Sequence, residues 1–379
     1  MNTATCYNIH FDTVMDSHIF KCNFKSNFFF IKGLNSACLE RTEFDIYIGN
    51  DKNIYSVDED NHFLVDHKFL FMPRKILFLE IDYQKRLIFI DGKKKLNVLV
   101  NKKLLVGQNY PDTVVVKIDT LNLDDLPNCT LKFDSVTKKK RLFYLYSLKE
   151  IRMIDLTRDP LTEIKSYNFS KFIPEEDYIL DFVPVFSYKR FYILSNQGII
   201  YQINFKLKLE NQLNLSLEHN NEKFNLIDKS LLENFLVVAS STNHEEKGDR
   251  LTERKIYCTS YLTLIKLKSK DLVITNKKKV LNSTTLGDRI EYLTFDSFLD
   301  KKNLYPLVTC FTKFDLNFFS YFVQKDNLVS SIKPQKLLSK HSSGGMISCA
   351  RLAGMKFVLF TKNGFILIVR RKNPNNKKK

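Results

Sequence analysis

The amino-acid sequence predicts an all-β protein built from repeats of one antiparallel unit. Two stretches share one order of residues, "RFYILSNQGIIYQINF" (Arg190 to Phe205) and "KFVLFTKNGFILIVRR" (Lys356 to Arg371). Each begins with a basic residue and an apolar run, turns at a polar segment that contains glycine, and continues with a second apolar run. β-Branched and aromatic residues dominate these runs, and amphipathic helical patterns are scarce along the chain. Both observations indicate strands joined as hairpins.

Seven hairpins of this kind follow one another along the chain. Successive hairpins start 42, 55, 49, 44, 71 and 51 residues apart, at Phe44, Arg86, Arg141, Arg190, Asn234, Tyr305 and Lys356. A short strand and a polar turn precede most of them, as in "YILDFVPVFSY" before Lys189. β-Rich units that recur about every 40–50 residues are typical of a β-propeller with four strands per blade. The sequence therefore predicts a seven-bladed β-propeller of four-stranded antiparallel blades.

The last hairpin needs a further strand, because an open propeller would leave an unpaired edge. We expect the N-terminal segment Thr3 to Asp12 to supply the outer strand of the last blade, so that the N-terminal strand closes the ring. The segment His18 to Lys32 would then begin the first blade. Residues 1–370 form one domain in this interpretation, with residues 241–254 as an inserted loop in the fifth blade and residues 371–379 as a flexible basic tail.

Hydroxyl residues end the first strand of four predicted hairpins, at Ser147, Ser195, Ser240 and Thr361. The last repeat, Ser339 to Val369, also has His341 and Ser342 where WD repeats usually carry a Gly-His pair. The chain resembles the WD40-like β-propeller superfamily over nearly its whole length, although it contains no tryptophan and therefore no Trp-Asp dipeptide. The segment Lys75 to Val100 is also similar to citron-homology propellers. These resemblances imply a propeller fold, and they also allow a membrane-trafficking scaffold.

Sequence motifs for catalysis, cofactors and metals are absent, including phosphate loops, dinucleotide fingerprints and nucleophile elbows. His62 and His67, with Asp60 and Asp66 nearby, fit a metal site less well than a solvated loop. We therefore expect no enzyme activity, cofactor or metal, and an active site at the channel mouth is a remote alternative. Seven scattered cysteines, no secretory signal and no long apolar run indicate an intracellular protein without an integral membrane segment.

Basic residues account for a net charge of +17 and recur at predicted turns. Five turns between the first and second strands carry them, at Lys85, Arg86, Lys138, Lys139, Lys140, Arg141, Lys189, Arg190, Lys301, Lys302 and Lys356. These turns open onto one face of a propeller, so they predict a basic rim for RNA or another polyanion. The interpretation that turns merely tolerate lysine, or that coding bias raises its number, carries equal weight.

Two further segments are candidate contacts. The inserted loop offers a partner surface at His244, Glu245, Glu246, Lys247, Asp249 and Arg250. The tail offers Arg370, Arg371, Lys372, Lys377, Lys378 and Lys379.

The expected function is a scaffold or adaptor subunit, monomeric within a multi-protein complex. The basic rim and tail favour RNA processing, ribosome assembly or chromatin, with a location in the nucleus, nucleolus or cytoplasm. A membrane-trafficking or vesicle-tethering scaffold is the alternative.

Overall fold

The computed structural model describes residues 6–9, 24–30, 34–39, 46–50, 54–57, 64–67, 76–81, 87–91, 95–100, 114–120, 131–133, 141–155, 164–216, 221–247, 254–268, 271–300, 303–337, 339–352, 356–362 and 365–371. Within these ranges the structure is almost entirely β, and its one helix is α1 (Lys340–Ser343). None of the described residues forms a helix of the length and apolarity needed to cross a membrane. The chain divides into two units, Met1–Leu121 with His341–Lys379, and Asn122–Lys340.

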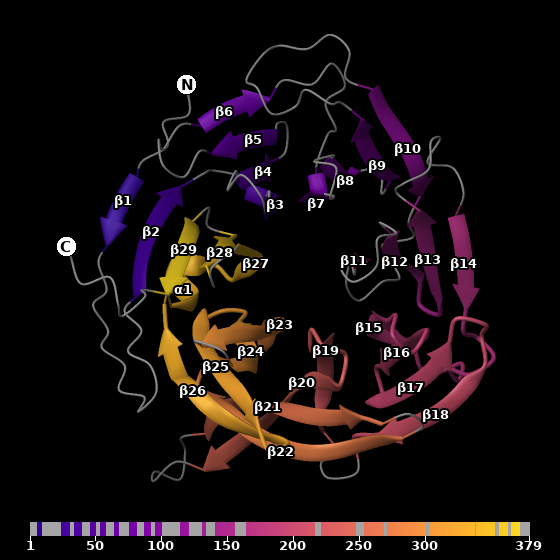
Figure 1. Cartoon of the computed structure of the whole chain (residues 1–379). Coiled ribbons are helices and arrows are strands. Elements are labelled where there is room, and N and C mark those ends of the chain that lie inside the picture. Colours follow the sequence, from indigo (N-terminus) through magenta and orange to yellow (C-terminus); the bar gives the residue numbers. More distant parts are fainter. Residues whose placement is uncertain are drawn as a thin grey trace. The chain divides into compact units, whose positions relative to one another are not determined.

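The unit Asn122–Lys340 contains antiparallel sheets of four strands, each in sequence order (Figure 1). Because neighbouring strands run in opposite directions, the turn between the second and third strands lies at the same end of the sheet as the start of the first strand. The sheets consist of β11 (Leu131–Phe133), β12 (Arg141–Ser147), β13 (Glu150–Asp155) and β14 (Ile164–Asn168); β15 (Ile179–Val185), β16 (Arg190–Ser195), β17 (Ile199–Asn204) and β18 (Leu209–Asn214); β19 (Lys223–Lys229), β20 (Phe235–Lys247), β21 (Arg254–Leu267) and β22 (Leu272–Ser283); and β23 (Ile290–Asp300), β24 (Asn303–Thr312), β25 (Asn317–Gln324) and β26 (Asn327–Lys336).

The other unit holds two more sheets of this kind and one larger sheet. The four-stranded sheets are β3 (Leu34–Leu39), β4 (Ile46–Asn50), β5 (Ile54–Val57) and β6 (Leu64–His67); and β7 (Ile76–Ile81), β8 (Leu87–Asp91), β9 (Lys95–Val100) and β10 (Val114–Thr120). The larger sheet has the order β1-β2-β29-β28-β27 and joins β1 (Cys6–Ile9), β2 (Phe24–Phe30), β27 (Met346–Leu352), β28 (Lys356–Thr361) and β29 (Phe365–Arg371). The first strand β3 lies against both β7 and β27.

The strand next to β29 differs from the expected one. β2 pairs with β29, with Asn27 opposite Ile368, and β1 lies outside β2. Within the segment Thr3 to Asp12 the described part, β1, is therefore not the direct partner of the last hairpin, and Phe24–Phe30 does not begin the first sheet, which starts at β3. Strand length explains the choice, because the seven residues of β2 pair along all of β29 whereas β1 has four residues.

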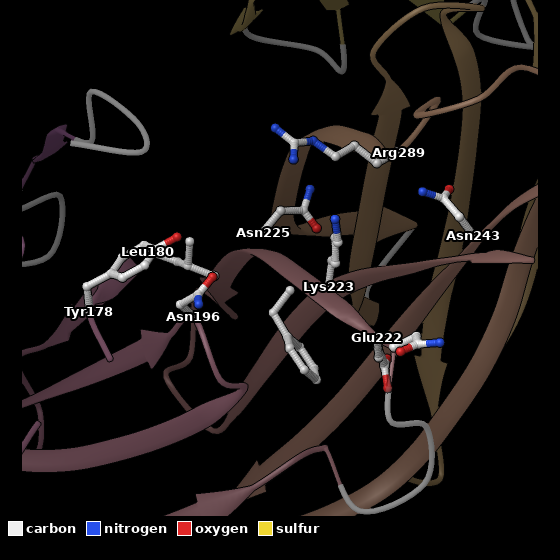
Figure 2. A pocket seen from close by; sticks show the side chains of 10 residues that line it. Tyr178, Leu180, Asn196, Glu222, Lys223, Asn225, Asn243 and Arg289 are labelled. Atoms are coloured by element: carbon white, nitrogen blue, oxygen red, sulfur yellow. The ribbon is translucent and has the colours of Figure 1, made fainter. Parts of the chain in front are cut away.

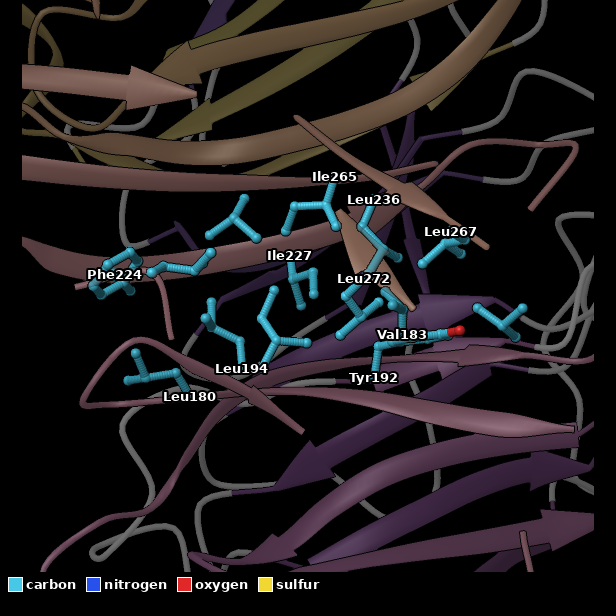
Figure 3. Packing of buried hydrophobic residues seen from close by; sticks show 14 residues of the cluster. Leu180, Val183, Tyr192, Leu194, Phe224, Ile227, Leu236, Ile265, Leu267 and Leu272 are labelled. Atoms are coloured by element: carbon cyan, nitrogen blue, oxygen red, sulfur yellow. The ribbon is translucent and has the colours of Figure 1, made fainter. Parts of the chain in front are cut away.

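Apolar runs in the second strands are explained by burial on both faces. In β16, Phe191 and Ile193 belong to the core shared with β12 and β13, whereas Tyr192 and Leu194 belong to the core shared with β19–β22. Successive side chains of a strand point to opposite faces, so alternate residues enter different cores. Figure 3 shows the second of these cores, which packs two neighbouring sheets face to face. Each large apolar side chain buried in this way contributes roughly 1.5–3 kcal/mol.

The hairpin of β20 and β21 corrects the predicted inserted loop. β20 continues through Lys247, and β21 begins at Arg254, directly opposite Lys247. Residues 241–247 are thus strand, and residues 248–253 lie outside the described residues. Cross-strand pairs account for the extension: the rings of His244 and Tyr257 stack with centroids 5.7 Å apart.

Candidate functional site

One irregularity recurs at the start of the first strands. In six of the seven sheets that the described residues form, pairing between the first and second strands skips one residue there. In the unit Asn122–Lys340 the skipped residues are Leu180, Asn225 and Glu291. A β-bulge bends the strand and redirects the side chain of the extra residue. The three bulges therefore define equivalent positions on three successive sheets.

An acidic residue lies three positions before each of these bulged residues, at Asp177, Glu222 and Asp288. Asp177 Oδ1 accepts a hydrogen bond from the Gln197 N–H at 3.1 Å. Asp288 Oδ1 accepts one from the Phe314 N–H at 2.8 Å. Glu222 accepts a hydrogen bond from the Ser240 hydroxyl. Each acid thus ties the start of a first strand to the second strand or to the turn that follows it.

Burial affects the titration of Asp288, which is fully buried. Desolvation raises the pKa of this carboxyl group above its ordinary value, while hydrogen bonds from the Phe314 and Asp315 N–H groups act in the opposite direction. Its hydrogen bonds place it among the residues that hold the turn together.

A pocket of about 690 Å³ opens beside these strand starts (Figure 2). Two sets of equivalent positions line it, namely the residues directly after the three acids, Tyr178, Lys223 and Arg289, and the bulged residues Leu180 and Asn225. The wall is completed by Asn196, Asn221, Glu222, Phe224 and Asn243. The repeat itself builds the pocket, because the same positions of neighbouring sheets converge on it.

Lys223 and Arg289 give the pocket a positive character. Figure 2 shows both side chains beside Asn225. Lys223 is exposed and forms no ion pair with the described residues. Arg289 Nε lies 3.2 Å from Glu291 Oε2, and its side chain stays 37% exposed. The carboxylate of Glu222 is fully buried and is neutralised by Lys277 Nζ at 2.8 Å.

Asn225 supplies an unsatisfied acceptor in the wall. Its side-chain Nδ2 donates a hydrogen bond to the Ile290 carbonyl oxygen. That contact fixes the amide orientation, because a carbonyl oxygen only accepts. Asn225 is 5% exposed, and its Oδ1 has no hydrogen-bond partner. A buried acceptor without a hydrogen bond lowers the stability of the fold by about 1–3 kcal/mol. A ligand that donates a hydrogen bond to this oxygen would recover part of that free energy on binding.

The predicted rim residues that the structure describes are Arg141, Lys189, Arg190 and Lys356. Each lies in, or directly after, the connection between a first and a second strand. Lys189 is exposed, but Arg190 forms an ion pair with Glu210. The turn that carries Lys189 lies at one end of its sheet, and the pocket lies at the other end. Outside the described residues lie Lys85, Arg86, Lys138, Lys139, Lys140, Lys301 and Lys302, so the basic rim stays a prediction.

The other candidate contacts divide in the same way. His244, Glu245, Glu246 and Lys247 belong to β20, and Arg370 and Arg371 end β29. Asp249, Arg250, Lys372, Lys377, Lys378 and Lys379 lie outside the described residues. His67 ends β6, and His62 lies outside. The described residues contain no cluster of three or more His, Cys, Asp or Glu side chains that fits a metal ion.

The hydroxyl residues that suggested WD repeats occupy buried positions in three sheets. Ser195, Ser240 and Thr361 are at most 1% exposed. Ser195 Oγ accepts the Ile199 N–H at 3.2 Å and so supports the turn between β16 and β17. Ser147 is half-buried, whereas His341 lies exposed on α1.

Sequence reasoning missed the pocket because it searched the turns between first and second strands. The available signal was a three-residue pattern at the start of the first strand. It reads acid, a long polar or aromatic residue, then an apolar residue, as in "DYI" at Asp177, "EKF" at Glu222 and "DRI" at Asp288.

Comparisons with known proteins bear on the fold. No protein-family model and no curated protein matches this chain. A solved structure of the WD40 β-propeller domain of Doa1 matches with a TM-score of 0.55 and 10% identity, covering 91% of this chain and 94% of that chain. The chain shares the β-propeller fold of that domain.

Two further solved structures widen the range of functions found on this fold. A chain of the Mitotic Checkpoint Complex matches with a TM-score of 0.54 and 9% identity, covering 91% of this chain and 93% of that one. A catalytically inactive histidine-to-alanine variant of virginiamycin B lyase from Staphylococcus aureus, with quinupristin, matches with a TM-score of 0.56 and 10% identity, covering 92% and 99%. At such identities the likeness concerns the fold alone.

Proposed function

We propose that this protein is a non-catalytic, WD40-like scaffold that holds partner proteins in a larger complex. The observation that carries the proposal is the polar pocket, which equivalent positions of three successive sheets line without a histidine or cysteine. Side chains of this kind, amides and two cations, suit recognition of another molecule better than proton transfer or nucleophilic attack.

We also propose that the seven sheets are seven blades of one propeller, closed by the N-terminal strand. The pairing of β2 with β29 supports this arrangement, because it places an N-terminal strand beside the last hairpin. Residues 1–370 then act as one domain, followed by the basic tail.

The proposed setting is a complex for RNA processing, ribosome assembly or chromatin, in the nucleus, nucleolus or cytoplasm, with one copy of this protein. The net charge of +17 supports it, since an excess of lysine attracts polyanions. A membrane-trafficking or vesicle-tethering scaffold is the alternative.

Affinity purification from the native cell, followed by mass spectrometry with and without nuclease, tests these proposals. A stable set of partners is expected, and recovery of the isolated chain alone would overturn the scaffold. Loss of the partners on nuclease treatment, and on charge reversal at Lys138, Lys139, Lys140 and Arg141, would support the RNA setting. Recovery of coat or tethering proteins would replace it with trafficking.

A lyase activity is the second candidate, because one structural neighbour is virginiamycin B lyase. That neighbour is inactivated by removal of a histidine, whereas none of the ten residues lining this pocket is a histidine. Incubation of the pure protein with quinupristin, followed by mass spectrometry, tests the candidate. Turnover above a heat-denatured control would overturn the non-catalytic proposal.

A further inference from the structure

We propose that the pocket between Tyr178 and Arg289 binds an acidic side chain presented by an extended peptide segment of a partner protein. The inference rests on the proposed scaffold function and names the chemistry of its partner. It follows from the charge, the hydrogen-bonding groups and the shape of the pocket.

Charge selects an anion. The ionised groups that line the pocket or pair with its lining residues are the cations Lys223, Arg289 and Lys277 and the carboxylates Glu222 and Glu291, among the described residues. The excess of one positive charge, which Lys223 carries, is not neutralised within the described part of the chain. Lys223 and Arg289 are the two cations in the wall itself, so an acidic side chain between them would gain charge-assisted hydrogen bonds.

Hydrogen-bonding groups select a ligand that also donates. Asn225 Oδ1 is buried and unpaired, so a simple carboxylate or sulfate ion would leave it unsatisfied. A peptide segment supplies backbone N–H donors beside its acidic side chains. The amides of Asn196, Asn221 and Asn243 each donate and accept, which matches the alternating N–H and C=O groups of an extended backbone.

Shape favours a peptide over a nucleotide. Phe224 is 5% exposed and packs on Gly198 of the neighbouring sheet, so its ring face is not free for base stacking. Tyr178 is then the remaining aromatic residue in the wall. The volume of about 690 Å³ lies within the roughly 300–1,000 Å³ typical of ligand pockets, and Leu180 adds an apolar contact beside the polar groups.

Fluorescence anisotropy with the full chain tests the proposal. The probe is a short, end-capped, fluorescein-labelled peptide in which glutamate alternates with leucine. The matched probe has glutamine in place of glutamate, and further arms use inorganic phosphate as competitor and a short single-stranded RNA. We expect saturable binding of the glutamate peptide, about 10–100-fold tighter than the glutamine peptide.

Variants locate the binding. Lys223→Met with Arg289→Met should weaken the glutamate peptide by about 10–100-fold and leave the glutamine peptide unchanged. Lys206→Met is the control, because Lys206 is exposed in the turn between β17 and β18, at the opposite edge of its sheet. Asn225→Leu should remove the rise in Tm that the glutamate peptide gives to the native chain, and circular dichroism checks that each variant is folded.

Three outcomes would contradict the proposal. Equal binding of both peptides, equal effects of the pocket and control variants, or binding of phosphate or RNA but no peptide would overturn the proposal. If a pocket variant still recovers the full set of partners from cells, the proposal that the pocket binds the partner is wrong, while the scaffold function stands. Specific peptide binding by a protein that recovers no partners would overturn the scaffold function instead.

Discussion

Gly198 lies in the turn between β16 and β17, and its backbone has a φ of +80°. L-residues with a side chain rarely adopt this left-handed conformation. A Cβ atom at this position would lie 2.2 Å from Phe224 Cε2 and 2.6 Å from Ser216 Oγ. The glycine therefore lets the Phe224 ring of the next sheet pack directly on the turn and fix one wall of the pocket.

Replacing Gly198 by alanine should lower the free energy of unfolding by roughly 2–4 kcal/mol, because left-handed strain and overpacking add. Gly287→Ala is the matched control: Gly287 has a φ of +74°, but the nearest atom to its Cβ would be 3.5 Å away. It should lose only about 1–2 kcal/mol. Urea unfolding measures both, and equal losses would show that the contact with Phe224 contributes nothing.

Glu233 links two turns at the opposite edge of the sheets. Its Oε2 accepts the Ser187 N–H at 2.9 Å, and its carboxylate pairs with Lys229. Burial alone would raise the pKa of Glu233, but the hydrogen bonds from Lys229 and Ser187 and the lysine charge outweigh it and lower the pKa. A lowered pKa means that the carboxylate stabilises the fold above its ordinary pKa and that this stabilisation is lost as the pH falls through the folded value.

Glu233→Gln should therefore reduce the stability of the protein near neutral pH, and the difference from the native chain should shrink as the pH falls below the ordinary glutamate pKa. Urea denaturation at neutral and acidic pH measures this difference. A gap that is constant across the pH range would show that the carboxylate acts by shape rather than by charge.

The sequence indicates the structural role of some single residues and not of others. The buried hydroxyls of Ser195, Ser240 and Thr361 follow from their place at the end of an apolar run. The role of Asn225 does not, because the bulged position itself has no fixed residue type, and it holds Leu180 in the preceding sheet.

At the scale of elements, the hairpin of β20 and β21 reaches beyond its four-stranded sheet. β19 pairs with β20 only as far as Ser241, whereas β21 pairs with β20 as far as Lys247. β22 pairs with β21 as far as Cys258, which lies opposite Asn243, so the part from His244 onward is a ribbon that only β20 and β21 form.

Hydrogen exchange should detect this ribbon, because every second amide between His244 and Lys247 bonds to β21 and should exchange slowly. The exposed turn residue Leu231 is the fast-exchanging reference. Exchange measured by NMR residue by residue gives the pattern. Uniformly fast exchange across the segment would restore the predicted loop.

Element positions were predictable where apolar residues mark them. All seven predicted hairpins coincide with paired strands, from β4–β5 to β28–β29. The ribbon was missed because its β20 residues, His244 to Lys247, are polar on both faces, so pairing across the strands reveals it and periodicity does not. β2 was misplaced for a similar reason, since the sequence shows that a strand exists but not which edge it joins.

At the scale of the whole molecule, the pairing of β2 with β29 joins residues from both ends of the chain. Asn27→Cys with Ile368→Cys should form a disulfide, because these residues are direct partners in the ladder. Asn27→Cys with Leu367→Cys is the control, since neighbouring strand positions point to opposite faces. Peptide mapping under oxidising conditions measures both, and cross-linking of neither pair would contradict the register.

Fold class follows from the period of the hairpins, which is a property of the whole sequence. The pocket does not, because it forms only when Tyr178, Lys223 and Arg289 of three sheets come together. Residues more than a hundred positions apart then line one wall, and a local sequence pattern does not show that they are neighbours.

The recurring bulge provides positions at which evolution can substitute residues without disturbing the sheets. A skipped residue takes no part in the pairing of the first two strands, so its side chain can be exchanged without breaking that ladder. The positions of Leu180 and Asn225 therefore allow new binding preferences to arise by single substitutions, while the cores between the sheets keep their packing.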